Sequence, residues 1–258
     1  MRIKRILKIS GAILFALVAA LGLTIAITFS GTAAILDGKE LAGGVRLVKD
    51  GFVSAAVLPA GEHEVVLVDC GNDAAARPLL AELKRRGLGP EAVSAILITH
   101  AHPDHIAGCK TFPKAELYGM AAEQPLLEGR AAGRGLLGKL LGAKDSGLRF
   151  SHALEDGAVV HVGTLEITAF AVPGHTAGSA AYLVSGILFL GDSADATSDG
   201  KMAGSKWLFS DDRAQDHASL RKLSERLAPQ SSDIKWLVFS HSAPLEGLGP
   251  LTAFASSR

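Results

Sequence analysis

The chain has 258 residues, of which 48% are hydrophobic and 20% are charged, and its formal net charge is zero. This composition is typical of a globular protein with a full core and gives no indication of intrinsic disorder. The balance of charge argues against a nucleic-acid-binding protein, because such a protein needs a concentrated basic face.

The N-terminus combines a basic segment with a long apolar one. Four of the first eight residues are Lys or Arg, and an apolar run follows from Ile9 to Phe29. A run of about 20 residues can cross a bilayer, and basic residues before it predict a cytoplasmic N-terminus with the rest of the chain outside. We therefore expect residues 1–30 to be a single-pass membrane anchor and residues 31–258 to be one domain. Small residues at 30–34 leave a cleaved signal sequence as the alternative, with a secreted or periplasmic domain.

The first half of the predicted domain changes from a meander to a strand–helix–strand pattern. Short apolar segments separated by turn residues indicate antiparallel strands. A helix is expected from Asn72 or Asp73 to about Arg86, where glycines end it. A further apolar segment then predicts a mixed sheet with helices packed on it. The expected strands of this half are 45–48, 52–58, 65–68 and 93–98.

The second half repeats this alternation after a weakly patterned stretch at 108–150. Leucine pairs, basic residues and several glycines indicate one or two short helices there. This stretch is a surface connection, a lid over a site, or a basic and apolar segment that rests on a membrane. Beyond it, a helix is expected from Asp211 to Ala228, with Ser210 as its N-cap. The expected strands are 158–160, 165–170, 180–184, 187–190 and 234–239.

Three histidines and one aspartate lie within six residues, directly after the strand at 93–98. Alternate residues of an extended segment point the same way, so His100 and His102 can face one metal ion. Asp104 and His105 lie just past the turn and can face a second. Histidine and aspartate bind zinc or iron through nitrogen and oxygen, so this motif predicts a metal site.

Other polar residues occupy equivalent places, each just after an apolar strand. Because strand ends on one edge of a sheet converge, we expect these residues to join the motif in one cluster. The remaining histidines do not follow strands, and we assign them no role. The residues at strand ends are Asp69, His175, Asp192 and His241, and the histidines left out are His63, His152, His161 and His217.

Two cysteines, Cys70 and Cys109, each follow a candidate site segment. In an oxidising compartment they could form a disulfide, and they could equally remain buried thiols. The sequence leaves both alternatives open.

Taken in order, these motifs resemble those of the metallo-β-lactamase superfamily. Asp69 lies in Val-Asp-Cys-Gly, the His-x-His-x-Asp-His run starts at His100, His175 lies in Pro-Gly-His-Thr, Asp192 lies in Gly-Asp-Ser, and His241 comes last. The pattern is most similar to glyoxalase II-like metallohydrolases, and the resemblance covers about residues 43–245. It implies an α/β fold, an αββα sandwich of two mixed β-sheets flanked by helices, with the metal site at the sheet edges.

The resemblance also implies two divalent metal ions, zinc in the first place, with iron or manganese as alternatives. Two such ions can hold a bridging water and lower its pKa. Asp104 is then the candidate to orient that water and to relay its proton. The implied ligands are His100, His102 and His175 for the first metal, Asp104, His105 and His241 for the second, and Asp192 for both, with Asp69 behind them orienting a ligand histidine or the loop.

We therefore expect a membrane-anchored, metal-dependent hydrolase of a small ester, thioester or lactone. The partners implied are a small-molecule substrate and the membrane; the sequence says nothing of the oligomeric state. Two alternatives are a mononuclear iron sulfur dioxygenase of the same fold and a non-catalytic metal-binding protein.

Overall fold

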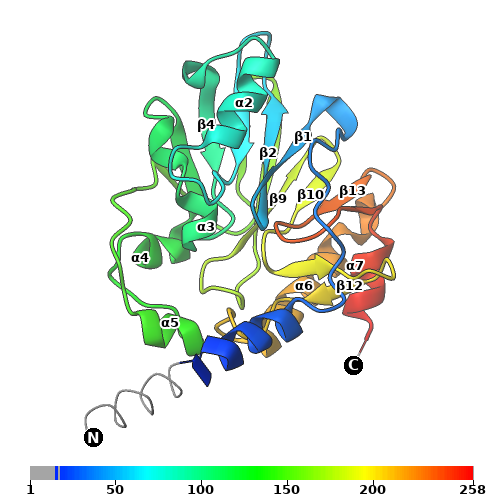
Figure 1. Cartoon of the computed structure of the whole chain (residues 1–258). Coiled ribbons are helices and arrows are strands. Elements are labelled where there is room, and N and C mark those ends of the chain that lie inside the picture. Colours follow the sequence, from blue (N-terminus) through cyan, green and yellow to red (C-terminus); the bar gives the residue numbers. More distant parts are fainter. Residues whose placement is uncertain (1–14, 17, 258) are drawn as a thin grey trace, which may run out of the picture.

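Two six-stranded β-sheets face each other, and helices cover their outer faces (Figure 1). The computed structural model describes residues 15, 16 and 18–257. Each sheet mixes parallel and antiparallel pairs: β3 runs parallel to β4 but antiparallel to β2, and β10 runs parallel to β13 but antiparallel to β9. The predicted α/β fold with mixed sheets and flanking helices is thus confirmed.

The first sheet has the strand order β1-β2-β3-β4-β5-β6. Its first three strands form an antiparallel meander because short turns join them, and the connections that carry helices make the later pairs parallel. The strands are β1 (Arg46–Asp50), β2 (Val53–Pro59), β3 (Val65–Val68), β4 (Val93–Leu97), β5 (Glu116–Met120) and β6 (His152–Leu154). The helices of this half are η1 (Ala42–Gly44), α2 (Arg77–Arg85), η2 (Pro90–Ala92), α3 (Pro103–Ile106), η3 (Cys109–Thr111), η4 (Ala121–Glu123), α4 (Gln124–Leu127) and α5 (Leu136–Leu141).

The second sheet has the order β14-β13-β10-β9-β8-β7, and a two-stranded ribbon of β11 and β12 lies beside it. Its strands are β7 (Val159–Val162), β8 (Leu165–Ala171), β9 (Ala180–Val184), β10 (Ile187–Phe189), β13 (Trp236–Val238) and β14 (Leu245–Glu246), and the ribbon is β11 (Ala194–Ala196) and β12 (Met202–Gly204). The helices are α6 (Arg213–Leu227), η5 (Ala228–Gln230) and α7 (Gly249–Ala255).

Three apolar clusters hold these layers together. The central one fills the space between the sheets and joins Leu58 of β2 to Tyr182 and Phe189 of the second sheet. The other two lie on the outer faces, one under α2 and one under α6 and α7. Each large side chain buried here contributes about 1.5–3 kcal/mol to the stability of the fold. Because the two sheets stack on this core, their strand ends meet at a fixed place.

Two helix starts differ from the sequence expectation, and capping explains both. The α2 helix begins at Arg77 because Asp73 instead closes a turn, accepting hydrogen bonds from the backbone of Ala75 and Arg77. The N-cap of α6 is Asp212, whose carboxylate accepts from the backbone N–H of Gln215 at 2.9 Å.

The described part of the predicted anchor is a helix at residues 18–28. Among the described residues, no helix is both long and apolar enough to span a membrane; residues 1–14 and 17 of the predicted anchor lie outside that set. After this helix the chain joins the second sheet's ribbon: Thr32 pairs with Thr197, and the N–H of Ala33 donates to the carbonyl of Ala196 at 2.9 Å. The division of the chain at residue 30 stays a prediction.

The two cysteines form a disulfide, which decides the alternative that the sequence left open. Cys70 and Cys109 are separated by 39 residues, and their Cα atoms lie 5.2 Å apart. The bond joins the loop after β3 to η3, on either side of the histidine-rich motif. The backbone N–H of Cys70 also donates to the carbonyl of His105 at 2.7 Å.

We predict that the Cys70→Ala/Cys109→Ala variant loses about 4 kcal/mol of unfolding free energy, because a loop of this length is no longer closed in the unfolded chain. Chemical denaturation with and without reductant measures this. Reductant should destabilise the natural protein and leave the variant unchanged. Equal stability of the two oxidised proteins would contradict the prediction.

Candidate metal centre

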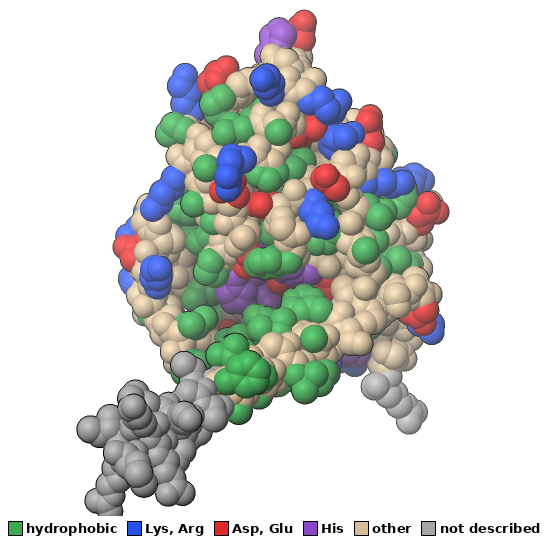
Figure 2. Space-filling model, viewed as in Figure 1, with side chains coloured by type: hydrophobic (Ala, Val, Ile, Leu, Met, Phe, Trp, Pro, Cys, Tyr) green, Lys and Arg blue, Asp and Glu red, His purple; other side chains and the backbone are tan. Residues whose placement is uncertain are grey.

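The residues predicted from the strand ends meet at one edge of the two sheets. His100 follows β4, His175 follows β8, Asp192 follows β10 and His241 follows β13. Figure 2 shows histidine side chains at the bottom of a hollow in the surface. Three groups of potential ligand atoms, each within 4.8 Å of one another, occur here: His100, His102 and His175; His100, His105 and Asp192; and Asp104, His105 and His241.

The first set consists of three imidazoles. The Nε2 atom of His175 lies 3.1 Å from Nε2 of His100 and 3.0 Å from Nδ1 of His102. Burial lowers the pKa of all three, that of His175 to about 3, so the rings are neutral. Neutral imidazoles hold lone pairs that can bind a metal.

The second set is more strongly charged. The Nε2 atom of His241 lies 3.0 Å from Asp192 Oδ2 and 3.4 Å from Asp104 Oδ2. The Nε2 atom of His105 lies 3.3 Å from Asp192 Oδ1. Burial by itself lowers the pKa of His105, but the surrounding carboxylates, Asp192 first, outweigh it and raise that pKa to about 10. Their negative field equally favours a cation at this place.

Asp192 lies between the two sets. Its Oδ2 atom is 3.6 Å from Nε2 of His175 and 4.0 Å from Nε2 of His100, while both of its oxygens face the second set. Within the described part of the chain, Nε2 of His105 and Oδ1 of Asp192 are buried without an aligned hydrogen-bond partner. Such atoms are costly unless a ligand satisfies them. The residues therefore fit two divalent cations, and their assignment as ligands stays a prediction.

Hydrogen bonds on the far side of four rings fix which nitrogen faces the site. The Thr99 hydroxyl donates to Asp69, and the Ser210 hydroxyl donates to the Lys206 carbonyl. The oxygens of these hydroxyls therefore accept from the rings of His100 and His175. In all four rings Nδ1 donates away from the site and Nε2 faces it. The Nδ1 partners are Thr99 Oγ1 for His100 (3.1 Å), Asp69 Oδ2 for His105 (2.8 Å), Ser210 Oγ for His175 (3.1 Å) and the Phe52 carbonyl for His241 (2.7 Å).

Asp69 contacts the start of the histidine-rich motif, and its proposed role behind the candidate ligands stays a prediction. Its Oδ1 accepts from the backbone N–H of Thr99 at 2.8 Å, and its Oδ2 accepts from the Thr99 hydroxyl at 2.7 Å as well as from His105. The backbone of Asp69 has a φ of 58°, a conformation that aspartate tolerates better than most residues. One carboxylate thus orients the start of the motif and one of its histidines.

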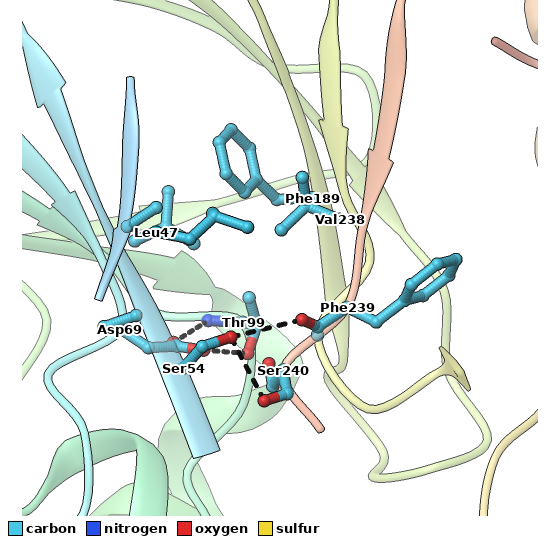
Figure 3. A pocket seen from close by; sticks show the side chains of 12 residues that line it. Leu47, Ser54, Asp69, Thr99, Phe189, Val238, Phe239 and Ser240 are labelled. Atoms are coloured by element: carbon cyan, nitrogen blue, oxygen red, sulfur yellow. Dashed lines mark hydrogen bonds between the residues drawn. The ribbon is translucent and has the colours of Figure 1, made fainter. Parts of the chain in front are cut away.

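A cavity of about 10 Å³ lies behind this edge, between the sheets (Figure 3). Its walls include Asp69, Thr99 and the apolar side chains of Leu47 and Phe189. Here the N–H of Ser54 donates to the carbonyl of Ser240 at 2.8 Å, which ties β2 to the residue before His241. The cavity is too small for a substrate, so a substrate has to enter through the hollow of Figure 2.

Sequence reasoning missed Glu123, a buried carboxylate that joins two loops that carry candidate ligands. It accepts hydrogen bonds from the backbone of Ala101, between the first two ligands, at 2.7 Å, and from Thr176 and Gly178 behind His175, each at 2.8 Å. Burial raises its pKa to about 7, although these donors act to lower it. Glu123 belongs to the weakly patterned stretch at 108–150, which offered no signal for it.

Aromatic side chains form the edge of the site next to His241. The ring of Phe52 stacks on that of His241 with 6.0 Å between centroids, and the ring of Phe29 meets it edge-on at 5.9 Å. Phe29 also lies 5.9 Å from Phe209. Phe29 lies at the end of the predicted membrane anchor. Nothing in the sequence indicated that its ring contacts a candidate ligand.

The family model of the metallo-beta-lactamase superfamily matches residues 48–241, and the chain belongs to this superfamily. By sequence it is 33% identical over 167 residues to a hydroxyacylglutathione hydrolase of Aeromonas hydrophila subsp. hydrophila, an alignment of 63% of this chain and 53% of the relative. A hydroxyacylglutathione hydrolase of Xanthomonas axonopodis pv. citri is 32% identical over 157 residues, with 59% and 50% covered. The chain thus spans about half the length of these curated relatives.

Solved structures of subclass B3 metallo-beta-lactamases have the same fold. BLEG-1 has a TM-score of 0.62 and 25% identity, covering 83% of this chain and all of the other. BJP-1 of Bradyrhizobium japonicum has a TM-score of 0.64 and 19% identity, with 89% and 93% covered; this likeness concerns the fold alone. The family match and the site together indicate a candidate metal centre in a chain of this superfamily.

We predict that Glu123→Gln weakens metal binding by about 10- to 100-fold, because an amide cannot accept from all three donors at once. Competition with a chromophoric chelator measures the affinity. The matched control is Glu128→Gln, five residues further on, where the partly buried carboxylate pairs with Arg130 and Arg149. Equal affinities of the two variants would contradict a positioning role for Glu123.

Proposed function

We propose that the chain is a hydrolase of a small thioester, ester or lactone that works with two divalent metal ions, zinc in the first place. The observation that carries this proposal is the position of Asp192, one carboxylate between two sets of imidazoles. A pair of bound divalent ions supplies a water activated at neutral pH and polarises the substrate carbonyl.

The protein's own groups provide the remaining functions. Asp104 is partly exposed in the hollow, and its Oδ2 lies 3.4 Å from His241 Nε2 and 3.7 Å from His105 Nε2. The pKa of Asp104 is lowered, because the two histidines outweigh the opposing effect of burial. An ionised carboxylate at the open side can orient water and accept its proton, which makes Asp104 the proposed general base.

Relatives by sequence suggest the order in which to test substrates. The relatives described above are named as hydroxyacylglutathione hydrolases, which favours a thioester first. Esters and lactones follow in the same screen.

Metal content and a ligand variant test this proposal. The purified full chain should contain about two zinc ions per molecule and hydrolyse thioesters, and a chelator should remove both properties. His102→Ala should abolish turnover and leave the circular dichroism spectrum unchanged, because a loop residue that holds metal is removed while the core remains. About one iron per chain would favour the sulfur dioxygenase alternative.

The control for that variant is His161→Ala, an exposed histidine of β7 that pairs with Glu166 at 3.3 Å. It should retain full turnover and metal content. Unchanged turnover in His102→Ala would contradict the proposed site, and absence of metal after reconstitution would favour the non-catalytic alternative.

We also propose that residues 1–30 anchor the chain and place the domain outside the cytoplasm. The basic and apolar N-terminus supports an anchor, and the Cys70–Cys109 disulfide supports an oxidising compartment. We predict that the chain stays in the membrane fraction after an alkaline carbonate wash. N-terminal sequencing of that fraction should begin near residue 1; a start near residue 31 in a soluble fraction would favour the cleaved signal sequence.

A further inference from the structure

The N-terminal helix at 18–28 is largely uncovered and is apolar apart from Thr24 and Thr28, whose hydroxyls donate to backbone carbonyls of the helix itself. Its side chains at 18, 21 and 25 lie on one face and those at 23 and 27 on the opposite face, and all five are exposed. A helix that is hydrophobic all round is stable where apolar material surrounds it. The exposed side chains are those of Val18, Leu21, Leu23, Ile25 and Ile27.

A second exposed apolar segment is α5, which lies at the same lower edge of the molecule in Figure 1. Leu140 and Leu141 are each 77% exposed, and Lys139 lies beside them in the helix. The start of α5 is fixed by a hydrogen bond from the N–H of Gly135 to Asp211 Oδ1 at 2.8 Å. Asp211 in turn donates its N–H to the carbonyl of His175 at 3.0 Å, so this surface is attached to a ligand loop.

The N-terminal helix lies next to the candidate metal centre, and α5 is connected to it through Asp211. The N-terminal helix ends at the Phe29 ring, which contacts His241 and Phe209. Trp207, two residues before Phe209, is 48% exposed. In Figure 2 a hydrophobic area lies directly beside the hollow that contains the histidines. We call the helix at 18–28, α5 and Trp207 the apolar rim.

The chain itself indicates what covers this rim. The sequence continues from the helix towards the N-terminus with mainly apolar residues as far as Ile9, and then with Arg2, Lys4, Arg5 and Lys8. Basic residues next to an apolar segment match the anionic surface of a bilayer. An exposed tryptophan is also typical of the membrane–water boundary. A lipid bilayer therefore accounts for the apolar helix, the basic residues and Trp207 together.

We propose that the apolar rim rests in a lipid bilayer, so that the metal centre opens towards the membrane surface and takes an amphiphilic substrate, a long-chain acyl ester or thioester. This rests on the proposed hydrolase function. The acyl chain stays in the apolar phase along the rim, while the polar carbonyl enters the hollow. Hydrolysis then releases a fatty acid and an alcohol or thiol, with water supplying the added atoms.

The test uses the metal-loaded full chain in vesicles of phosphatidylcholine and phosphatidylglycerol. Two substrates are compared, soluble p-nitrophenyl butyrate and p-nitrophenyl palmitate embedded in the vesicles. Leu140→Glu/Leu141→Glu should slow palmitate hydrolysis by about tenfold or more, because charged side chains resist insertion, and should leave butyrate hydrolysis unchanged. The matched control is Val159→Glu, an exposed valine of β7 away from the rim, which should change neither rate.

The outcomes separate this inference from the function on which it rests. If the natural protein hydrolyses neither ester nor the corresponding thioesters, the hydrolase function itself fails. If it hydrolyses butyrate but the rim variant handles palmitate normally, the membrane-facing rim is overturned and the hydrolase stands. If the rim variant instead converts a dimer into a monomer in light scattering, the rim is a contact between copies and the bilayer proposal is wrong.

Tryptophan fluorescence gives a readout that is independent of turnover. The chain has two tryptophans, Trp207 on the rim and the half-buried Trp236 of β13. Vesicles with brominated acyl chains should quench part of the emission, and Trp207→Phe should remove that quenching. Equal quenching in the natural protein and in this variant would overturn the placement of the rim.

Discussion

The site depends on the position of one largely buried carboxylate, Asp192, among five imidazoles at the meeting edge of two sheets. A buried charge is tolerated only where partners of opposite charge or a metal compensate it. Asp192 has these partners because His105 and His241 approach its two oxygens at 3.3 and 3.0 Å. The neutral rings of His100, His102 and His175 lie on the other side of Asp192. Asp192 therefore separates a neutral half of the centre from a charged half.

The rest of the fold keeps these side chains in place. The apolar core between the sheets sets the distance between the ends of β4, β10 and β13. Hydrogen-bond partners behind four of the rings, one of them the Asp69 carboxylate, set the orientation of those rings. Asp69 acts on the first turn of the motif and Glu123 joins the loops of His100 and His175. Such supporting groups commonly change metal affinity when they are replaced. In this chain both come from the first half of the sequence, and Glu123 also reaches the loop that follows β8 of the second sheet.

The N-terminus connects this chemistry to its surroundings. Phe29 ends the exposed apolar helix and at the same time packs against His241, and Asp211 connects α5 to the loop of His175. The apolar surface and the metal centre therefore share residues in one small region. A hydrolase built in this way would meet its substrate where water and lipid adjoin.

The sequence by itself determined the strand–helix alternation, the family and the polar residues at strand ends, because apolar periodicity and motif order are local properties of the chain. The sequence alone predicts Asp69, His100 and Asp192 as site residues. Only the tertiary structure decided that Cys70 bonds to Cys109, that Glu123 joins the loops of His100 and His175, and that the ring of Phe29 meets that of His241. These contacts join residues distant in sequence through the stacking of two sheets, and no local pattern records which loops that stacking brings together.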